Sequence, residues 1–375
     1  MKVLLKAINK MQTTVSTRFK LFLAFSTGIV TTLNAQETEN KTWKIRGNGE
    51  FYYQTDFNNP KANTRPVFVY NHNRNNEVNL NLGLLRVNYE REHLRANLGV
   101  AVGTYMNANY SSESGGFKNI YEANVGFKLS KEYALWLDVG ILPSHIGFES
   151  AIAGDNYALT RSMMAENSPY FETGAKLSYR TSSGKWEMAI LVLNGWQRIQ
   201  RVEGNTTPAI GHQLSYRPNE KVLLNSSSFI GNDMPDEQRK MRYFHDLYGQ
   251  FQLMDKFALQ VGFDIGMQQR EKGSEHYAVW YTPIIIAKYA PTERMNVAVR
   301  GEYYMDKEEV VISTETANGF QTFGVSLNID YRVLPNLLWR LEVKKLKSKD
   351  AVFLMRDGGL NEDITGVVTS VSISF

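Results

Sequence analysis

The sequence predicts an all-β fold: a transmembrane, antiparallel, up-and-down β-barrel of about 16 strands that follows a cleaved signal peptide. Three observations predict it. Apolar residues alternate with polar or small ones along most of the chain, short and long connections alternate between these segments, and an aromatic residue precedes each short connection. The chain has 375 residues, 43% of them hydrophobic, and no cysteine. A disulfide scaffold, a cysteine-ligated metal and a thiol nucleophile are therefore excluded.

Residues 1–35 are predicted to be an export signal that is removed. They combine a basic region without acidic residues, an apolar core at residues 21–30, and a small-residue cleavage site at Leu33-Asn34-Ala35. An uncleaved anchor is the alternative, but an apolar run of about ten residues is too short to span a bilayer. Met11 is a second candidate start. Removing five basic residues turns the formal charge of +4 negative, which argues against a nucleic-acid partner.

The mature region, residues 36–375, carries the alternation. Between residues 257 and 268 every odd-numbered residue is apolar and every even-numbered residue is small or polar, which is typical of a strand with one apolar and one wet face. The segments 221–231 and 277–290 alternate poorly. The sixteen predicted strands are 42–54, 77–90, 94–106, 119–130, 134–141, 170–181, 185–197, 209–217, 221–231, 242–253, 257–270, 277–290, 295–306, 319–333, 337–346 and 364–375.

The connections support a barrel that crosses a membrane. Seven tight turns alternate with eight longer loops, so both ends of the predicted barrel lie on the short-turn side. A soluble β-sandwich is the alternative, but its strands are usually shorter than the 10–13 residues typical here. The aromatic residues that lie on the apolar face before each tight turn are predicted to form a girdle at one membrane interface: Tyr89, Phe127, Tyr179, Tyr216, Phe251, Tyr289 and Tyr331.

Two local sequences carry a resemblance to a known family. They are residues 159–170, which run into the sixth predicted strand, and the terminal Ser372-Ile373-Ser374-Phe375. The chain resembles the outer-membrane β-barrel porins of Gram-negative bacteria, and among them the OmpL-like porins. The resemblance implies a water-filled channel in the cell outer membrane for passive diffusion of small hydrophilic solutes and ions. It also implies a C-terminal assembly signal at Phe375, and as partners outer-membrane lipid, lipopolysaccharide, the barrel-assembly machinery and two further copies in a homotrimer.

The candidate constriction follows from the longest connection, residues 142–169. The resemblance implies that this third outer loop folds into the lumen, and an ordinary surface loop is the alternative. Asp155 is expected to cap a short helix that runs through Ala165 or Glu166. The other inward charges are nearly balanced, which predicts weak ion selectivity of neither sign. The candidate constriction residues are Glu149, Asp155, Arg161 and Glu166 in the loop and Lys44, Arg46, Arg86 and Arg95 on the first strands.

Enzymatic activity is not predicted. None of the six histidines lies in a G-x-S-x-G or H-E-x-x-H frame, so an outer-membrane hydrolase is the least favoured reading. The sequence has no phosphate loop, dinucleotide turn or EF-hand spacing, and we expect no cofactor and no metal. A substrate-specific or plugged barrel with a binding or structural role remains the alternative function. Its loop at residues 51–76, rich in asparagine and aromatic residues, is a candidate binding surface.

Overall fold

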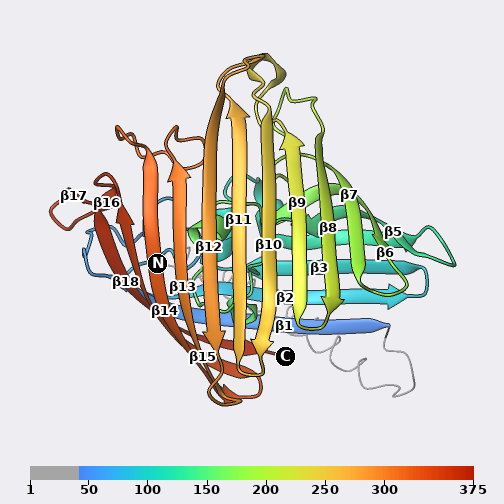
Figure 1. Ribbon diagram of the computed structural model, residues 1–375, viewed down its shortest axis with the longest axis horizontal. Helices are drawn as coiled ribbons and strands as arrows, with labels where there is room; N and C mark the ends of the chain where they lie inside the picture. The colour runs from blue at the N-terminus through green and yellow to red at the C-terminus, as the bar shows by residue number, and fades with distance from the viewer. Residues whose placement is uncertain (1–41) are drawn as a thin grey trace, which may run out of the picture. The chain divides into compact units, whose positions relative to one another are not determined.

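The computed structural model describes residues 42–375, and the predicted signal peptide lies outside the described residues. Sixteen antiparallel strands form a closed barrel in which each strand pairs with its neighbours in the sequence and β1 pairs with β18 (Figure 1). The barrel strands are β1 (Trp43–Asp56), β2 (Val78–Arg91), β3 (Leu94–Val102), β4 (Ile120–Lys128), β5 (Ala134–Pro143), β6 (Phe171–Arg180), β7 (Trp186–Leu193), β8 (Ala209–Asn219), β9 (Val222–Gly231), β10 (Arg242–Met254), β11 (Phe257–Gln269), β12 (Tyr277–Tyr289), β13 (Met295–Asp306), β14 (Phe320–Leu334), β15 (Leu337–Ser348) and β18 (Asp363–Ser374).

The sixteen-stranded barrel, the strand positions and the alternation of short and long connections are confirmed. The strands predicted at 94–106 and 185–197 are too long, because β3 ends at Val102 and β7 ends at Leu193. Gly103 has a φ of +122°, and a Cβ built on it would lie 2.4 Å from the carbonyl oxygen of Asn81. Only glycine accepts this backbone so close to a neighbouring strand. The chain therefore leaves the sheet at Gly103 and continues as helix α2 (Thr104–Asn109).

Alternation of side chains produces the two faces of the wall. In β11, Phe263, Ile265 and Met267 are exposed on the outer face, whereas Gln260 and Asp264 are buried on the inner face. The outer surface carries many exposed large hydrophobic residues, as expected where lipid rather than water is the solvent. Among the described residues no helix has the length and apolar character needed to cross a membrane.

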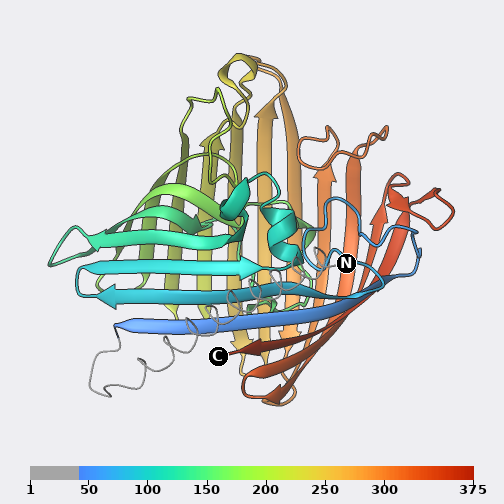
Figure 2. The ribbon, with the colours of Figure 1, turned by 180° about the vertical axis from the view of Figure 1, so that it is seen from behind.

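The long loops fold over and into the barrel, so much of its inner wall is buried (Figure 2). Loop 103–119 places Tyr105, Met106 and Tyr110 against Leu82 and Leu84 of the wall. Besides α2, the short elements are α3 (Met163–Glu166), the 3₁₀ turns η1 (Gly115–Asn119), η2 (Ala153–Asp155) and η3 (Asp236–Gln238), and the hairpin of β16 (Phe353–Leu354) and β17 (Leu360–Asn361) in the last loop.

Candidate functional site: the barrel lumen

The loop between β5 and β6, residues 144–170, lies against inward-facing side chains of β13 to β15. Three of its backbone N–H groups donate to these side chains: Leu159 to Asn328 at 3.0 Å, Thr160 to Glu342 at 2.5 Å, and Met163 to Glu302 at 2.6 Å. Irregular backbone at membrane depth requires such partners, because lipid offers none. Two carboxylates and one amide of the wall therefore accept hydrogen bonds from the backbone of this loop.

Basic side chains of the same wall bind the carbonyl groups of the loop. Arg300 donates to the carbonyl oxygen of Thr160 at 2.7 Å and to its hydroxyl at 3.0 Å. Arg340 donates to the carbonyl oxygens of Ala153 and Asn156, and Lys344 donates to that of Arg161 at 3.1 Å. Arg300 also forms an ion pair with Glu342 at 2.7 Å. These charges fasten the loop and do not line open water.

His145 fixes the start of the loop to three further strands. Its Nδ1 contacts Glu172 at 2.7 Å and its Nε2 contacts the carbonyl oxygen of Ser228 at 2.8 Å. Gly211 leaves room for the ring, since a Cβ there would lie 2.7 Å from Nε2. Burial alone would lower the pKa of His145, but the Glu172 carboxylate and its hydrogen bond raise that pKa above its ordinary value.

His145, Glu172 and Ser228 look like a hydrolytic triad but lack its geometry. A triad needs the serine hydroxyl beside the imidazole. Here the group beside Nε2 is the Ser228 carbonyl, whereas the Ser228 hydroxyl contacts Nδ1 of His212 at 2.5 Å. The imidazole of His145 is also fully buried. This cluster positions a loop and presents no nucleophile.

The predicted constriction charges of the loop occupy different places. The Glu149 carboxylate accepts from the backbone and hydroxyl of Ser162. Glu166 accepts from the backbone N–H groups of Tyr70 at 2.8 Å and Asn71 at 3.2 Å, which fastens loop 57–77 to this loop. The Arg161 guanidinium lies 3.7 Å from the ring centre of Tyr170 and is buried. Asp155 is exposed and lines an inner cavity.

The helix in this loop is shorter than the sequence predicts, and the expected Asp155 cap is wrong. Helix α3 covers only Met163–Glu166, and its N-cap is Ser162, whose hydroxyl accepts from the N–H of Ala165 at 3.1 Å. Asp155 instead lies at the end of the 3₁₀ turn η2. The backbone between the two elements is irregular, and its N–H groups at Leu159 and Thr160 donate to Asn328 and Glu342 of the β13–β15 wall, where a helix would bond them internally.

An apolar cluster fills the lumen toward the long-loop end. Phe68 of loop 57–77 contacts Phe320 and Phe353, with ring centres 4.6 and 6.3 Å away. A gap of about 10 Å³, about the room for one water molecule, lies beside Phe68 and Arg161. A separate cavity of about 340 Å³ is lined by Phe68, Val352 and Ile364. The other core members include Ile146 and Met163 of loop 144–170 and the inward residues Leu191, Leu193, Phe229, Phe244, Trp280, Tyr304, Leu346 and Ile364.

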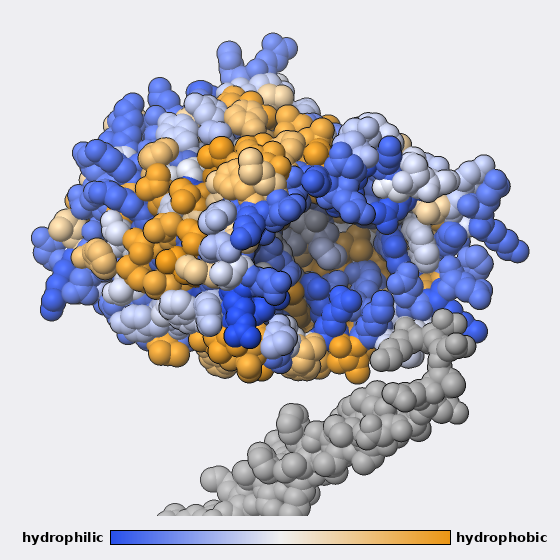
Figure 3. Space-filling model, turned by 60° about the horizontal axis from the view of Figure 1, so that its bottom comes forward, coloured by the Kyte–Doolittle hydropathy of each residue, from blue (hydrophilic) through white to orange (hydrophobic). Residues whose placement is uncertain are grey.

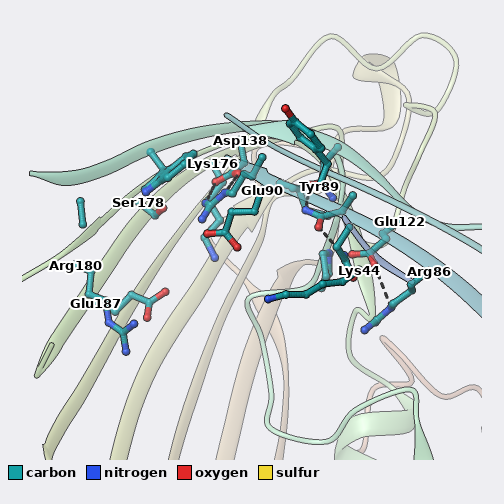
Figure 4. Close-up of a pocket in the computed structure, with 18 of the residues that line it drawn as sticks. Lys44, Arg86, Tyr89, Glu90, Glu122, Asp138, Lys176, Ser178, Arg180 and Glu187 are labelled. Atoms are coloured by element: carbon teal, nitrogen blue, oxygen red, sulfur yellow. Dashed lines mark hydrogen bonds and ion pairs between the residues drawn. The ribbon is translucent and has the colours of Figure 1, made fainter. Parts of the chain in front are cut away.

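A larger cavity lies toward the short-turn end, beside the low-numbered strands. Figure 3 shows a hollow at this end whose margin is largely hydrophilic. A cavity of about 700 Å³ there is lined by six basic and four acidic side chains from β1 to β7. Figure 4 shows Lys44 and Arg86 extending from the β1–β2 wall of this cavity. The basic set is Lys44, Arg46, Arg86, Arg95, Lys176 and Arg180, and the acidic set is Glu90, Glu122, Asp138 and Glu187.

Ion pairs and an amide ladder order this cavity wall. Arg86 pairs with Glu122 at 3.1 Å, and Arg95 pairs with Asp138. The Arg95 guanidinium also lies 4.4 Å from the ring centre of Trp136, a cation–π contact. Between these pairs the amides of Asn88, Asn97 and Asn124 form a chain of hydrogen bonds at 2.7 and 2.8 Å. The wall thus presents polar groups that water or a hydrophilic solute can contact.

A second cavity of about 520 Å³ shares Arg46 and Arg86 with the first. Its other walls include η2 and its neighbours in loop 144–170, with Ile152 and Asp155, the β14–β15 turn with Arg332, and the end of β18 with Phe375 beyond it. Arg46 and Arg86 therefore stand where the two cavities meet. Of the eight predicted constriction residues, the structure places Lys44, Arg46, Arg86, Arg95 and Asp155 beside open space and buries the side chains of Glu149, Arg161 and Glu166.

The C-terminal residue closes the seam between the first and last strands. Phe375 exchanges backbone hydrogen bonds with Gly47 at 2.8 and 3.0 Å. A Cβ on Gly47 would lie 2.1 Å from the Phe375 ring, so glycine makes room for that ring. Among the predicted girdle residues, Tyr89 lies beside Trp43 and Tyr216 lies beside Trp186, with ring centres 4.6 and 4.2 Å apart. The two tryptophans extend the aromatic positions that the sequence singled out.

Sequence reasoning missed the inward aromatic cluster. A signal was present, because Phe229, Phe244 and Trp280 occupy wet-face positions of their strands. Strand alternation alone cannot separate an aromatic residue that faces water from one that faces a loop. The distinction depends on loop 57–77 and loop 144–170, which reach these positions only in the folded barrel.

Comparison with known proteins places the chain among channels. The profile of the family described as beta-barrel porin-2, OmpL-like, matches residues 42–375. No curated protein matches significantly. Similar solved structures are the anion-selective porin from Comamonas acidovorans (12% identity, TM-score 0.59, 89% of this chain and 99% of that one) and the outer-membrane channel DcaP of Acinetobacter baumannii (10%, 0.57, 90% and 99%). A trimer form of OmpT from Vibrio cholerae is also similar (8%, 0.57, 89% and 99%).

Proposed function

The chain belongs to the OmpL-like β-barrel porin family and is an outer-membrane channel, and from that premise we propose passive diffusion of small hydrophilic solutes and ions along the β1–β6 side of its lumen. The observation that carries this proposal is the pair of polar cavities that share Arg46 and Arg86. Loop 144–170 narrows the lumen opposite them and acts as the constriction. The buried ion pair of Arg300 and Glu302 holds loop 144–170 in this position.

Several assignments accompany this function. Residues 1–35 direct export and are removed, and the aromatic rows at the short-turn end hold the barrel at the membrane interface beside lipid and lipopolysaccharide. Phe375 acts in assembly through the barrel-assembly machinery. The functional unit is a homotrimer, which is supported by the similarity to OmpT in its trimer form. We assign no catalysis, and the arrangement of His145 and Ser228 supports this assignment.

The apolar packing around Phe68 favours a second candidate function. A barrel closed at its outer end by loops is suited to a gated, substrate-specific or structural role. The measurement that separates the candidates is single-channel conductance of the folded, detergent-purified protein in a planar bilayer. Diffusion predicts discrete steps that grow with salt concentration. If protein that circular dichroism shows to be a folded barrel gives no conductance steps, passive diffusion is contradicted. That result supports the closed barrel.

A further inference from the structure

We propose that Arg46 and Arg86, with Lys44 beside them, form a subsite that binds the carboxylate or phosphate group of an anionic solute where the two inner cavities meet. This inference rests on the proposed function and deepens it, because it names the class of solute. Both cavities are lined by both arginines, so a solute that passes from one cavity to the other contacts this pair. The charge of Arg46 and Arg86 therefore controls which solutes pass between the two cavities.

Arg46 and Arg86 lie side by side on neighbouring strands, and their like charges repel each other. Arg46 on β1 and Arg86 on β2 are direct cross-strand partners. Side chains at such positions have Cβ atoms about 4.5–5.5 Å apart, and like charges there repel. Within residues 42–375 no ion pair joins Lys44 or Arg46 to a carboxylate, and Arg86 shares only Glu122. An anion between the guanidinium groups would remove the repulsion.

The surrounding acids do not supply that anion. In the first cavity Glu122 is already paired with Arg86, and Asp138 with Arg95. Glu90 and Glu187 also line this cavity, but within residues 42–375 neither forms an ion pair with Arg46 or Arg86. Asp155 lines the second cavity, and within the described barrel it forms no ion pair with Arg46. Arg300 differs from Arg46 because its guanidinium is fully buried and its charge is neutralised by the carboxylates of Glu302 and Glu342. Lys44, Arg46 and Arg86 therefore carry more positive charge than their ion-pair partners neutralise where the two cavities meet.

The chemistry of these side chains suits an oxyanion. A guanidinium presents a planar fork of N–H donors that matches a carboxylate or phosphate, and its charged hydrogen bonds are stronger than neutral ones. Lys44 and Arg46 are exposed to the cavity, so a solute reaches them without unfolding the wall. A cavity of about 700 Å³ accommodates a small hydrated organic acid.

Two measurements test the subsite, one of conduction and one of equilibrium binding. The first is the reversal potential of single channels under a potassium chloride gradient, for the wild type and for R46Q/R86Q. We expect the wild type to prefer chloride and the double variant to lose or reverse that preference. The second is calorimetric titration of the folded proteins in detergent with inorganic phosphate, where we expect about a tenfold or greater loss of affinity in R46Q/R86Q.

Matched variants keep the test specific. R270Q/K307Q removes the same charge from connections at the long-loop end, outside both cavities, and should leave the reversal potential and phosphate affinity unchanged. R46K/R86K retains charge but not the planar fork, so it should retain chloride preference with weakened phosphate binding. Heat-modifiable migration in detergent gels verifies that each variant is folded.

The outcomes separate this inference from the function beneath it. If the channels conduct and R46Q/R86Q matches the wild type in both reversal potential and phosphate affinity, the subsite is refuted. The proposed passive diffusion is then unaffected. If the protein never conducts but its phosphate binding depends on Arg46 and Arg86, the subsite is supported. The proposed passive diffusion is then refuted. An equal effect of R270Q/K307Q would show that overall charge, and not this junction, controls the measurements.

Discussion

At the scale of single residues, the inward charges fall into two groups that differ in what they contact. Arg300 and Glu302 are buried against loop 144–170 and against each other. Lys44 and Arg46 are exposed to the inner cavity. Similar positions on the wet face of a strand thus carry opposite roles. The first group stabilises the filled side of the lumen, and the second sets the electrostatics of the open side.

Removal of a buried guanidinium should loosen the loop. In R300Q the carboxylates of Glu302 and Glu342 lose their shared partner, and we expect a loss of about 3–5 kcal/mol in the free energy of unfolding, as for other broken buried ion pairs. Urea unfolding in lipid vesicles measures it. R270Q is the control, because the Arg270–Glu308 pair is exposed and should contribute less than about 1 kcal/mol. Comparable losses in the two variants would contradict the anchoring role.

The His145–Glu172 contact predicts a pH dependence. Because the folded state raises the pKa of His145 above its unfolded value near 6.5, the contact contributes fully below that pH and is lost as pH rises through the folded pKa. The stability difference between wild type and H145Q should therefore shrink between pH 5.5 and pH 8.5. H276Q, which replaces an exposed histidine, is the control and should show no such trend. A difference constant with pH would refute the protonated contact.

At the scale of elements, β9 shows why one strand alternates poorly. Its Ser226 and Ser228 face outward, in line with lipid-facing residues of β8 and β10. Ser226 contacts His245 at 3.1 Å and Ser228 contacts His212 at 2.5 Å. Polar side chains at these positions break the apolar pattern of the segment 221–231. Their hydrogen bonds reduce the cost of polar groups next to lipid.

Replacing one polar pair on this outer face should stabilise the barrel. The S226V/H245L variant removes both members of a hydrogen-bonded pair and leaves neither partner unsatisfied. We expect the free energy of unfolding in lipid vesicles to rise by about 1–2 kcal/mol. S227V is the matched control, because Ser227 faces inward and donates to the carbonyl of His145, so that change should destabilise the protein. Destabilisation by S226V/H245L would indicate that this outer face has a polar partner.

At the scale of the whole molecule, the lumen is divided by where the loops pack. Loops 57–77 and 144–170 cover the apolar cluster toward the long-loop end, and the larger inner cavity remains beside the β1–β7 wall. Glu166 joins the two loops through the backbone of Tyr70 and Asn71. Conduction through the outer end therefore depends on how tightly these loops pack.

Truncation of Phe68 tests that dependence. F68A removes a buried ring that contacts Phe320 and Phe353, and we expect a loss of about 3 kcal/mol in stability together with a larger single-channel conductance. F323A removes a ring from the outer face, where Phe323 is 53% exposed, and should leave conductance unchanged. Equal conductance of F68A and wild type would show that the apolar cluster does not limit permeation.

Local sequence patterns were sufficient to predict the barrel. Period-two alternation, alternating connection lengths and the terminal Phe375 predicted the closed sixteen-stranded sheet, because each strand must present one face to lipid whatever fills the lumen. The inward positions of Lys44, Arg46, Arg86 and Arg95 followed from the same alternation. These features are local and repeat every second residue, so they are legible without tertiary contacts.

The role of each inward residue depends on tertiary contacts that these patterns do not encode. Arg46 and Arg300 occupy equivalent wet-face positions, yet one is exposed to a cavity and the other is buried beneath loop 144–170. The exit at Gly103 depends likewise on the close approach of Asn81 on β2, and the first turn of α3 is held by the hydrogen bond from Met163 to Glu302 on β13. The physical reason is that the path of a loop depends on hydrogen bonds and packing with strands more than a hundred residues away, and no local pattern encodes which strands it meets.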